Sequence, residues 1–134
     1  MLPTKSLILL IVDDHAGMRQ LIATIVNDMA EQIHECSDGS QALAAYNECK
    51  PDWVLMDIRM NNMDGIAATR EIKSAYPDAQ IVIVTDYDHP DLRLSAQLAG
   101  ACEYVSKQNL LEIRKILSRE GFSGGGPRKI QEEI

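Results

Sequence analysis

Cysteine is scarce in this sequence, and its few thiols are dispersed. Cys36, Cys49 and Cys102 are odd in number and form no Cys-x-x-Cys pair, which argues against a disulfide framework and against a zinc site. We therefore expect reduced thiols that pack as small, buried hydrophobic side chains, in a cytoplasmic protein.

Basic charge and long apolar runs are also lacking. The formal net charge of the 134 residues is −7, so we expect this domain to bind no nucleic acid by itself. The apolar run at 7–12 is far too short to span a bilayer, and we expect no membrane partner. With 46% hydrophobic residues, the chain can still build the core of one domain.

Short apolar runs alternate with segments of helical periodicity. Runs without apolar–polar alternation are typical of parallel strands that helices cover on both faces. The strand candidates are 7–12, 32–36, 53–56, 81–84 and 102–105. Helical patterns follow them at 18–29, 40–49, 66–76, 91–99 and 110–117. In the first pattern, one apolar stripe at helical spacing is formed by Met18, Leu21, Ile22, Ile25, Val26 and Met29. Five strand–helix repeats predict an open, parallel α/β sheet with helices on both sides.

Glycine marks a change near the carboxyl-terminal end. Gly121 and the run Gly124–Pro127 break any regular element, and the residues after them are too few to form a core. We expect one domain at 1–120, followed by a flexible linker or tail at 121–134.

Polar and charged side chains follow four of the strand candidates. Asp13 and Asp14 come directly after the first, Asp57 after the third, Thr85 after the fourth and Lys107 after the fifth. In an open α/β sheet, ligands bind beyond the carboxyl ends of the strands. We therefore expect three carboxylates, one hydroxyl and one amine to meet at one edge of the sheet.

Clustered carboxylates need a cation. Two unit charges 4 Å apart repel by roughly 4 kcal/mol at an effective dielectric constant of about 20. Oxygen ligands without cysteine or histidine favour Mg²⁺. A carboxylate beside this ion can attack phosphorus and form an acyl phosphate. The ion and Lys107 would offset the phosphoryl charge, and the Thr85 hydroxyl could hydrogen-bond one phosphoryl oxygen.

Four motifs in register resemble the receiver domain of bacterial response regulators. They are IVDD at 11–14, LMDIRMNNMDG at 55–65, VT at 84–85 and YVSK at 104–107. The resemblance covers about residues 6–119. It implies a flavodoxin-like (βα)5 fold, a doubly wound parallel sheet with strand order 2-1-3-4-5.

The resemblance also assigns roles around the expected Mg²⁺ ion. Asp57 resembles the phosphoacceptor and is also a metal ligand. Asp14 resembles the direct metal ligand, and Asp13 the acid that acts mainly through metal-bound water. The backbone carbonyl of Arg59 would be a further metal ligand. The phosphoryl donor would be a sensor histidine kinase, and the chain would catalyse only its own phosphorylation and dephosphorylation.

Three further positions resemble residues that bind the phosphoryl group or respond to its presence. Thr85 and Lys107 resemble the switch hydroxyl and the phosphate-binding lysine. Tyr104 resembles the aromatic residue that rotates between outward and inward positions. Phosphorylation would then change the surface of the fourth helix, fifth strand and fifth helix, with formation of a homodimer as one expected consequence.

Three positions depart from the usual pattern of the family. Asn61 replaces a common proline, which loosens a turn. Asp86 stands after Thr85, where a small residue is usual. Gln108 replaces a common proline after Lys107. That junction and the VDDH opening at 12–15 are similar to regulators with a LuxR-type helix-turn-helix output, so we expect control of transcription through an output domain absent here.

Other interpretations of these residues remain open. Asp13 and Asp14 could cap the following helix, and Tyr104 could be a static, half-buried tyrosine. A receiver that binds a partner without phosphorylation is the main functional alternative. A haloacid-dehalogenase-like phosphatase is disfavoured, because that family needs an aspartate two residues after the nucleophile, where this chain has Arg59.

Asp86 is predicted to make the chain a slow phosphoacceptor. A carboxylate beside Thr85 would repel an anionic phosphodonor and compete for Lys107. Salt screens such repulsion over about 10 Å at 0.1 M, so Asp86→Ala should speed phosphorylation most at low ionic strength. Rates of both forms across a salt series check this. Equal rates at every salt concentration would leave Asp86 as part of the loop at 87–90 only.

Overall fold

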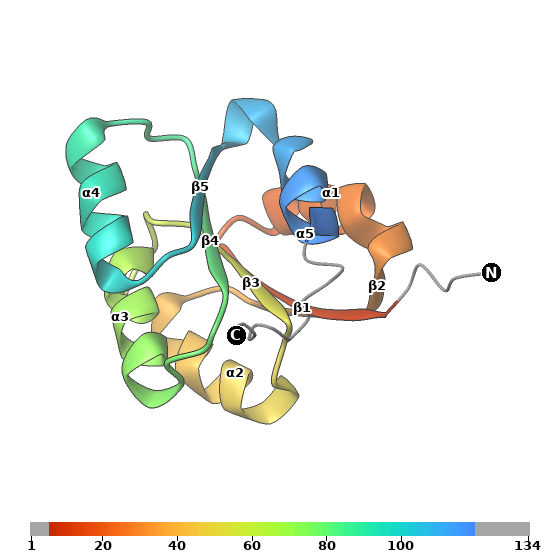
Figure 1. Cartoon of the computed structure of the whole chain (residues 1–134), viewed down its shortest axis with the longest axis horizontal. Helices are drawn as coiled ribbons and strands as arrows, with labels where there is room; N and C mark the ends of the chain where they lie inside the picture. The colour runs from red at the N-terminus through yellow and green to blue at the C-terminus, as the bar shows by residue number, and fades with distance from the viewer. Residues whose placement is uncertain (1–5, 120–134) are drawn as a thin grey trace, which may run out of the picture.

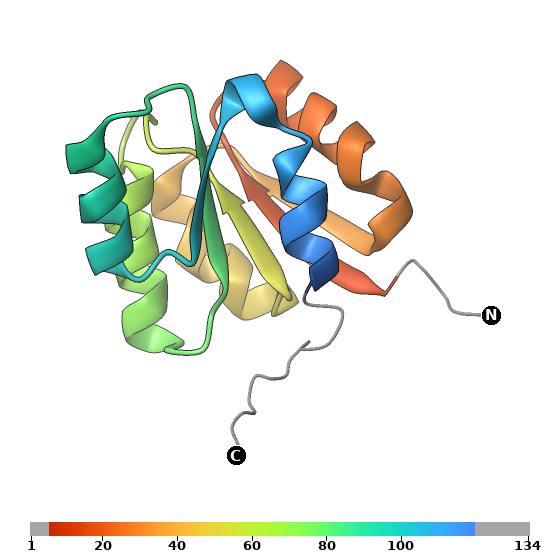
Figure 2. The same ribbon diagram turned by 45° about the horizontal axis from the view of Figure 1, so that its top comes forward.

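A parallel sheet of five strands lies between two layers of helices (Figures 1 and 2). The computed structural model describes residues 6–119. Its strands are β1 (Leu7–Val12), β2 (Ala30–Cys36), β3 (Trp53–Met56), β4 (Ile81–Thr85) and β5 (Glu103–Ser106). Their order across the sheet is β2-β1-β3-β4-β5, and all four neighbouring pairs are parallel. The predicted fold class and strand order are therefore confirmed.

Each strand is followed by a helix, and the first four helices return the chain to the next strand. The helices are α1 (Ala16–Val26), α2 (Ala42–Cys49), α3 (Gly65–Ala75), α4 (Pro90–Ala99) and α5 (Glu112–Arg119). Short 3-10 helices, η1 (Asn27–Met29), η2 (Gly39–Gln41) and η3 (Lys107–Asn109), stand between the larger elements. Figure 1 shows α1 and α5 on one face of the sheet, and α2, α3 and α4 on the other.

The continuous apolar runs are explained by this double covering. Leu10 and Val54 point into a core shared with α2, α3 and α4. Leu9 and Leu55, one residue away in each strand, point into the core shared with α1 and α5. Because successive side chains of a strand face opposite sides, a strand that is buried on both faces has no polar alternation.

The ends of α4 follow the sequence signals. Pro90 occupies the first turn of the helix, where its missing N–H leaves no hydrogen bond unmade. Gly100 ends the helix in a left-handed conformation with φ of 110°, which glycine adopts without the steric cost of a Cβ atom.

Three details of the sequence-based expectations were wrong. The first helix ends at Val26 rather than at 29, because the chain tightens into η1 before β2 begins. Leu21, expected on one apolar stripe with Ile22 and Val26, is 46% exposed, whereas those two residues are buried against the sheet. Cys102, expected to be buried, is exposed in the turn before β5, and the other two cysteines are only partly buried.

Two further predictions concern the carboxyl-terminal tail and the capacity of the chain to span a membrane. The expected tail at 121–134 and the boundary at 120 lie outside the described residues. Within residues 6–119, no helix is long and apolar enough to cross a membrane.

Candidate functional site

Three carboxylates meet at the carboxyl-terminal edge of the sheet. Carboxylate oxygens of Asp13, Asp14 and Asp57 lie within 4.8 Å of one another. Asp13 follows β1 and Asp57 follows β3, its neighbour in the sheet, so that strand pairing alone brings the two together. Both are buried, with exposed fractions of 1% and 6%, whereas Asp14 is exposed.

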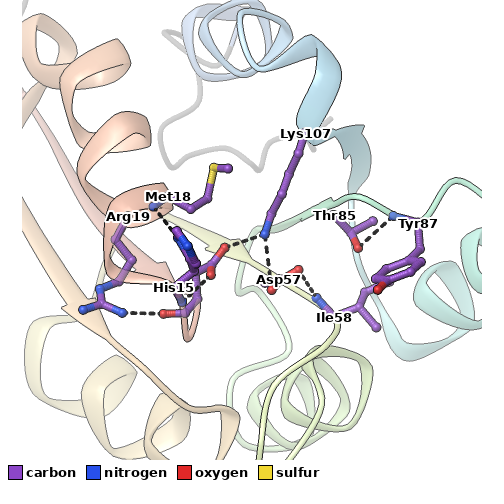
Figure 3. Close-up of polar contacts among 9 residues, drawn as sticks. His15, Met18, Arg19, Asp57, Ile58, Thr85, Tyr87 and Lys107 are labelled. Carbon is purple, nitrogen blue, oxygen red and sulfur yellow. Dashed lines mark hydrogen bonds and ion pairs between the residues drawn. The ribbon is translucent and has the colours of Figure 1, made fainter.

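Lys107 places its ammonium group between the two buried carboxylates (Figure 3). Its Nζ atom lies 2.8 Å from Asp13 Oδ2 and 3.4 Å from Asp57 Oδ2. The lysine side chain is itself only 8% exposed. The structure therefore brings together the acids after β1 and β3 and the amine after β5, as expected from the sequence.

Backbone N–H groups orient both carboxylates toward the lysine. Oδ1 of Asp13 accepts a hydrogen bond from the N–H of His15 at 2.8 Å. Oδ1 of Asp57 accepts one from the N–H of Ile58 at 2.9 Å. In each residue this leaves Oδ2 for Lys107. The N-cap of α1 is His15, whose Nδ1 accepts from the N–H of Met18, so Asp13 and Asp14 do not serve as that cap.

Burial and charge shift the ionisation of this cluster. Burial is the main reason that the pKa of Asp57 rises to about 6, and the neighbouring Asp13 carboxylate adds to the rise. Lys107 partly offsets both effects. Burial alone would lower the pKa of Lys107, but its hydrogen bond to Asp13 and the charges of both carboxylates raise that pKa overall. The amine is therefore charged at neutral pH, and Asp57 is mostly ionised.

Thr85 and Tyr104 are joined through the backbone of Tyr87. Thr85 is fully buried at the end of β4, and its hydroxyl oxygen accepts from the N–H of Tyr87 at 3.3 Å (Figure 3). The hydroxyl of Tyr104 donates to the carbonyl of the same Tyr87. Arg93 of α4 covers the Tyr104 ring at 4.6 Å from its centroid. Tyr87 was not identified from the sequence, because a tyrosine in a loop carries no distinctive pattern.

An open cavity of about 290 Å³ leads to this cluster. It is lined by Asp14, His15, Met18, Asp57, Arg59, Asp86, Tyr87 and Lys107. The Arg59 guanidinium lies 4.3 Å from the centroid of the Tyr87 ring and so covers one side of the opening. Asp86 is exposed and lies in this lining, which is the position expected of it.

The loop after Asp57 is closed tightly at its base. The N–H of Gly65 donates to the carbonyl of Ile58 at 2.8 Å. A Cβ atom at position 65 would lie 1.8 Å from the carbonyl oxygen of Asp57, so only glycine fits there. Asp64 caps α3 by accepting from the N–H of Ala67 at 2.8 Å.

Known proteins match both the sequence and the fold. The response regulator receiver domain family matches residues 9–118. The chemotaxis protein CheY of Bacillus subtilis (strain 168) is 40% identical over 100 residues, which cover 74% of this chain and 83% of that protein. A two-component response regulator of the LuxR family from Aurantimonas sp. SI85-9A1 superimposes with a TM-score of 0.79 at 29% identity, over 86% of this chain and 84% of that one.

The CheX–CheY–BeF3–Mg²⁺ complex from Borrelia burgdorferi is similar in fold, with a TM-score of 0.81 at 21% identity over 89% of this chain and 92% of that chain.

The sheet order and the acidic pocket define a flavodoxin-like protein of the signal-receiving class. The chain belongs to the response regulator receiver domain family, and its place is therefore in two-component signal transduction. Receiver domains bind Mg²⁺ in an acidic pocket of this kind.

Replacement of Asp57 should stabilise the metal-free fold. The pKa of Asp57 rises from an ordinary 3.8 to about 6 on folding. Above that pKa the folded chain holds an ionised carboxylate that it disfavours, so Asp57→Asn should be more stable than the wild type by roughly 1–3 kcal/mol near pH 7. The difference should shrink as the pH falls through 6 and vanish below about 4, where both folded and unfolded chains are protonated.

Urea unfolding in the presence of a chelator, at several pH values, measures this difference in the free energy of unfolding. A stability difference that stays constant between about pH 4 and pH 8 would contradict the assignment of the raised pKa to Asp57.

Proposed function

We propose that Asp57 accepts a phosphoryl group from a sensor histidine kinase, with Mg²⁺ bound at the adjacent carboxylates. The observation that supports this most directly is the buried pair of Asp13 and Asp57 with the Lys107 amine between them. A buried like-charge pair is costly to maintain, and the arrangement is useful for stabilising charge on a transferred phosphoryl group.

The residues present suit a magnesium ion. The donors would be carboxylate oxygens of Asp13, Asp14 and Asp57 and the backbone carbonyl of Arg59, an all-oxygen set. Asp14 and Asp57 both line the cavity, so a bound ion could keep water molecules and share a phosphoryl oxygen. When bound, Mg²⁺ would offset negative charge on the phosphoryl oxygens and the carboxylates. The related Borrelia complex contains both Mg²⁺ and BeF3, which is in keeping with this proposal.

Phosphoryl transfer requires an ionised, correctly oriented carboxylate. Oδ1 of Asp57 is held by the N–H of Ile58, so Oδ2 is the oxygen that attacks phosphorus. A P–O bond forms, the P–N bond to the kinase histidine breaks, and the imidazole nitrogen keeps the electron pair and takes up a proton. Lys107, already beside Oδ2, then binds a phosphoryl oxygen. Hydrolysis of the acyl phosphate by water returns Asp57, and the chain turns over no other substrate.

The phosphoryl group would be sensed through Thr85. The hydroxyl oxygen of Thr85 accepts a hydrogen bond from the N–H of Tyr87. If the Thr85 side chain turned toward a phosphoryl oxygen, this hydrogen bond would be lost. The carbonyl of Tyr87 holds Tyr104, and Arg93 of α4 lies on the Tyr104 ring. Phosphorylation would thus shift an existing equilibrium of the α4–β5–α5 surface. We propose that this surface controls dimerisation and a transcriptional output, as the likeness to a LuxR-family regulator suggests.

Acetyl phosphate and Mg²⁺ should phosphorylate the wild type, whereas Asp57→Asn should incorporate at least 10-fold less label. Removal of Mg²⁺ by a chelator should have the same effect. Asp52→Asn is a matched control, because the Asp52 carboxylate accepts from the N–H of Ile8 at the opposite edge of the sheet. Label retained by Asp57→Asn at the wild-type level would show that another residue is the acceptor. An unlabelled wild type would favour a receiver that works without phosphorylation.

Addition of the phosphate mimic beryllofluoride with Mg²⁺ should move amide resonances beyond the pocket. Tyr87 and Tyr104 should shift because their hydrogen bonds depend on Thr85, and Thr85→Ala should abolish the shifts near Tyr104 while leaving those near Asp57. Amide chemical shifts recorded with and without the mimic measure this. Shifts confined to the residues around Asp57 in the wild type would refute the proposed route.

A further inference from the structure

A further aspartate, Asp38, lies outside the cavity and joins two loops at the same edge of the sheet. Asp38 follows β2 and is only 7% exposed. Its Oδ1 atom accepts from the backbone N–H groups of Ser40 and Met63, each at 3.3 Å. Its Oδ2 atom accepts from the Ser40 hydroxyl at 3.0 Å and from the side-chain amide of Asn62. Every one of these donors is therefore local to η2 or to the loop that follows Asp57.

The two loops also touch through their backbones. A Cβ atom at Gly39 would lie 2.2 Å from the carbonyl oxygen of Met63. Glycine is therefore required here, because the backbones of the two loops approach each other closely. The far end of the loop at 58–64 is thus held by Asp38 and Gly39. Its base is held by the hydrogen bond from Gly65 to Ile58.

Arg59 lies between these two anchors. Its backbone carbonyl is the one proposed metal ligand that no side chain supplies. Asn61, at the position where receivers commonly have proline, does not restrain φ as proline would, and no hydrogen bond of its side chain is found among the described residues. The hydrogen bonds to Asp38, together with the close contact between Gly39 and Met63, therefore restrain the far end of this loop.

We propose that Asp38 is a positioning residue for the metal site: through Asn62 and Met63 it holds the loop that carries the Arg59 carbonyl, and so strengthens Mg²⁺ binding. A ligand on a restrained loop loses less conformational freedom on binding than one on a free loop. Residues that orient metal ligands commonly change metal affinity by about 10- to 100-fold when they are replaced. This inference rests on the proposed function, in which Mg²⁺ binds at Asp13, Asp14 and Asp57.

Asn62→Ala is the sharpest test, because it removes a donor to Asp38 without changing the charge near the site. Its Mg²⁺ dissociation constant should rise roughly 10-fold, as measured by calorimetric titration of the protein with MgCl₂. Asn61→Ala is the matched control in the same loop and should bind Mg²⁺ as the wild type does. Thermal unfolding without Mg²⁺ should separate the two variants far less than the titrations do.

Exchange of the two partners provides a rescue. Asn62→Asp alone would place two carboxylates side by side and should weaken Mg²⁺ binding, although its added negative charge would by itself attract the cation. The double variant Asp38→Asn/Asn62→Asp has the same net charge as the wild type. Its amide at position 38 can again donate a hydrogen bond to a carboxylate, now at position 62. Its Mg²⁺ affinity should return to within about 3-fold of the wild type, since a single hydrogen bond is again made.

The outcomes separate the two proposals. A wild type that binds no Mg²⁺ would overturn the proposed function itself. If the wild type binds Mg²⁺ and Asn62→Ala has the same Mg²⁺ dissociation constant, only the role of Asp38 is overturned. An affinity loss in Asn62→Ala that also occurs in Asn61→Ala, or that the exchanged pair does not restore, would show that the loop is sensitive to any substitution and would likewise overturn that role.

Discussion

The ion pairs of Lys107 with two buried carboxylates are the interaction on which the site depends. Asp13 and Asp57 directly follow neighbouring strands, and without a cation their negative charges would repel each other at a position that is almost inaccessible to water. The lysine comes from the end of β5, two strands away from β3, because the residues at the end of β4, Thr85 and Asp86, supply no positive charge at this edge. Its long side chain spans that distance, so the sheet order determines which cation serves the pair.

Backbone groups give this cluster its geometry. The N–H groups of His15 and Ile58 each take one oxygen of a carboxylate and turn the other toward the amine. The backbone of Tyr87 likewise forms two hydrogen bonds: its N–H donates to the Thr85 hydroxyl oxygen, and its carbonyl accepts from the Tyr104 hydroxyl. Tyr87 lies in the loop between β4 and α4, so its two hydrogen bonds link the end of β4 to Tyr104 of β5.

The sequence predicted the parts of this protein that follow from local periodicity and strand ends. Continuous apolar runs indicated a sheet covered on both faces, and the residues after each run indicated the acidic pocket. Leu21 was placed wrongly, because the 3-4 spacing of apolar residues includes the margin of the stripe, and only packing against the sheet decides that Ile22 is buried while Leu21 is not. Cys102 was placed wrongly because hydrophobicity alone does not say whether a turn is covered.

The sequence by itself determined the succession of strands and helices along the chain, because this depends on the periodicity of apolar residues. It also determined the kind of chemistry at the strand ends, because this depends on which residues directly follow each strand. The tertiary structure decided which groups touch. The Asp38–Gly39 turn is an ordinary signal along the chain, and only the approach of Asn62 and Met63 from another loop brings it into contact with the loop that follows Asp57. Contacts between loops depend on packing in three dimensions, which no local pattern encodes.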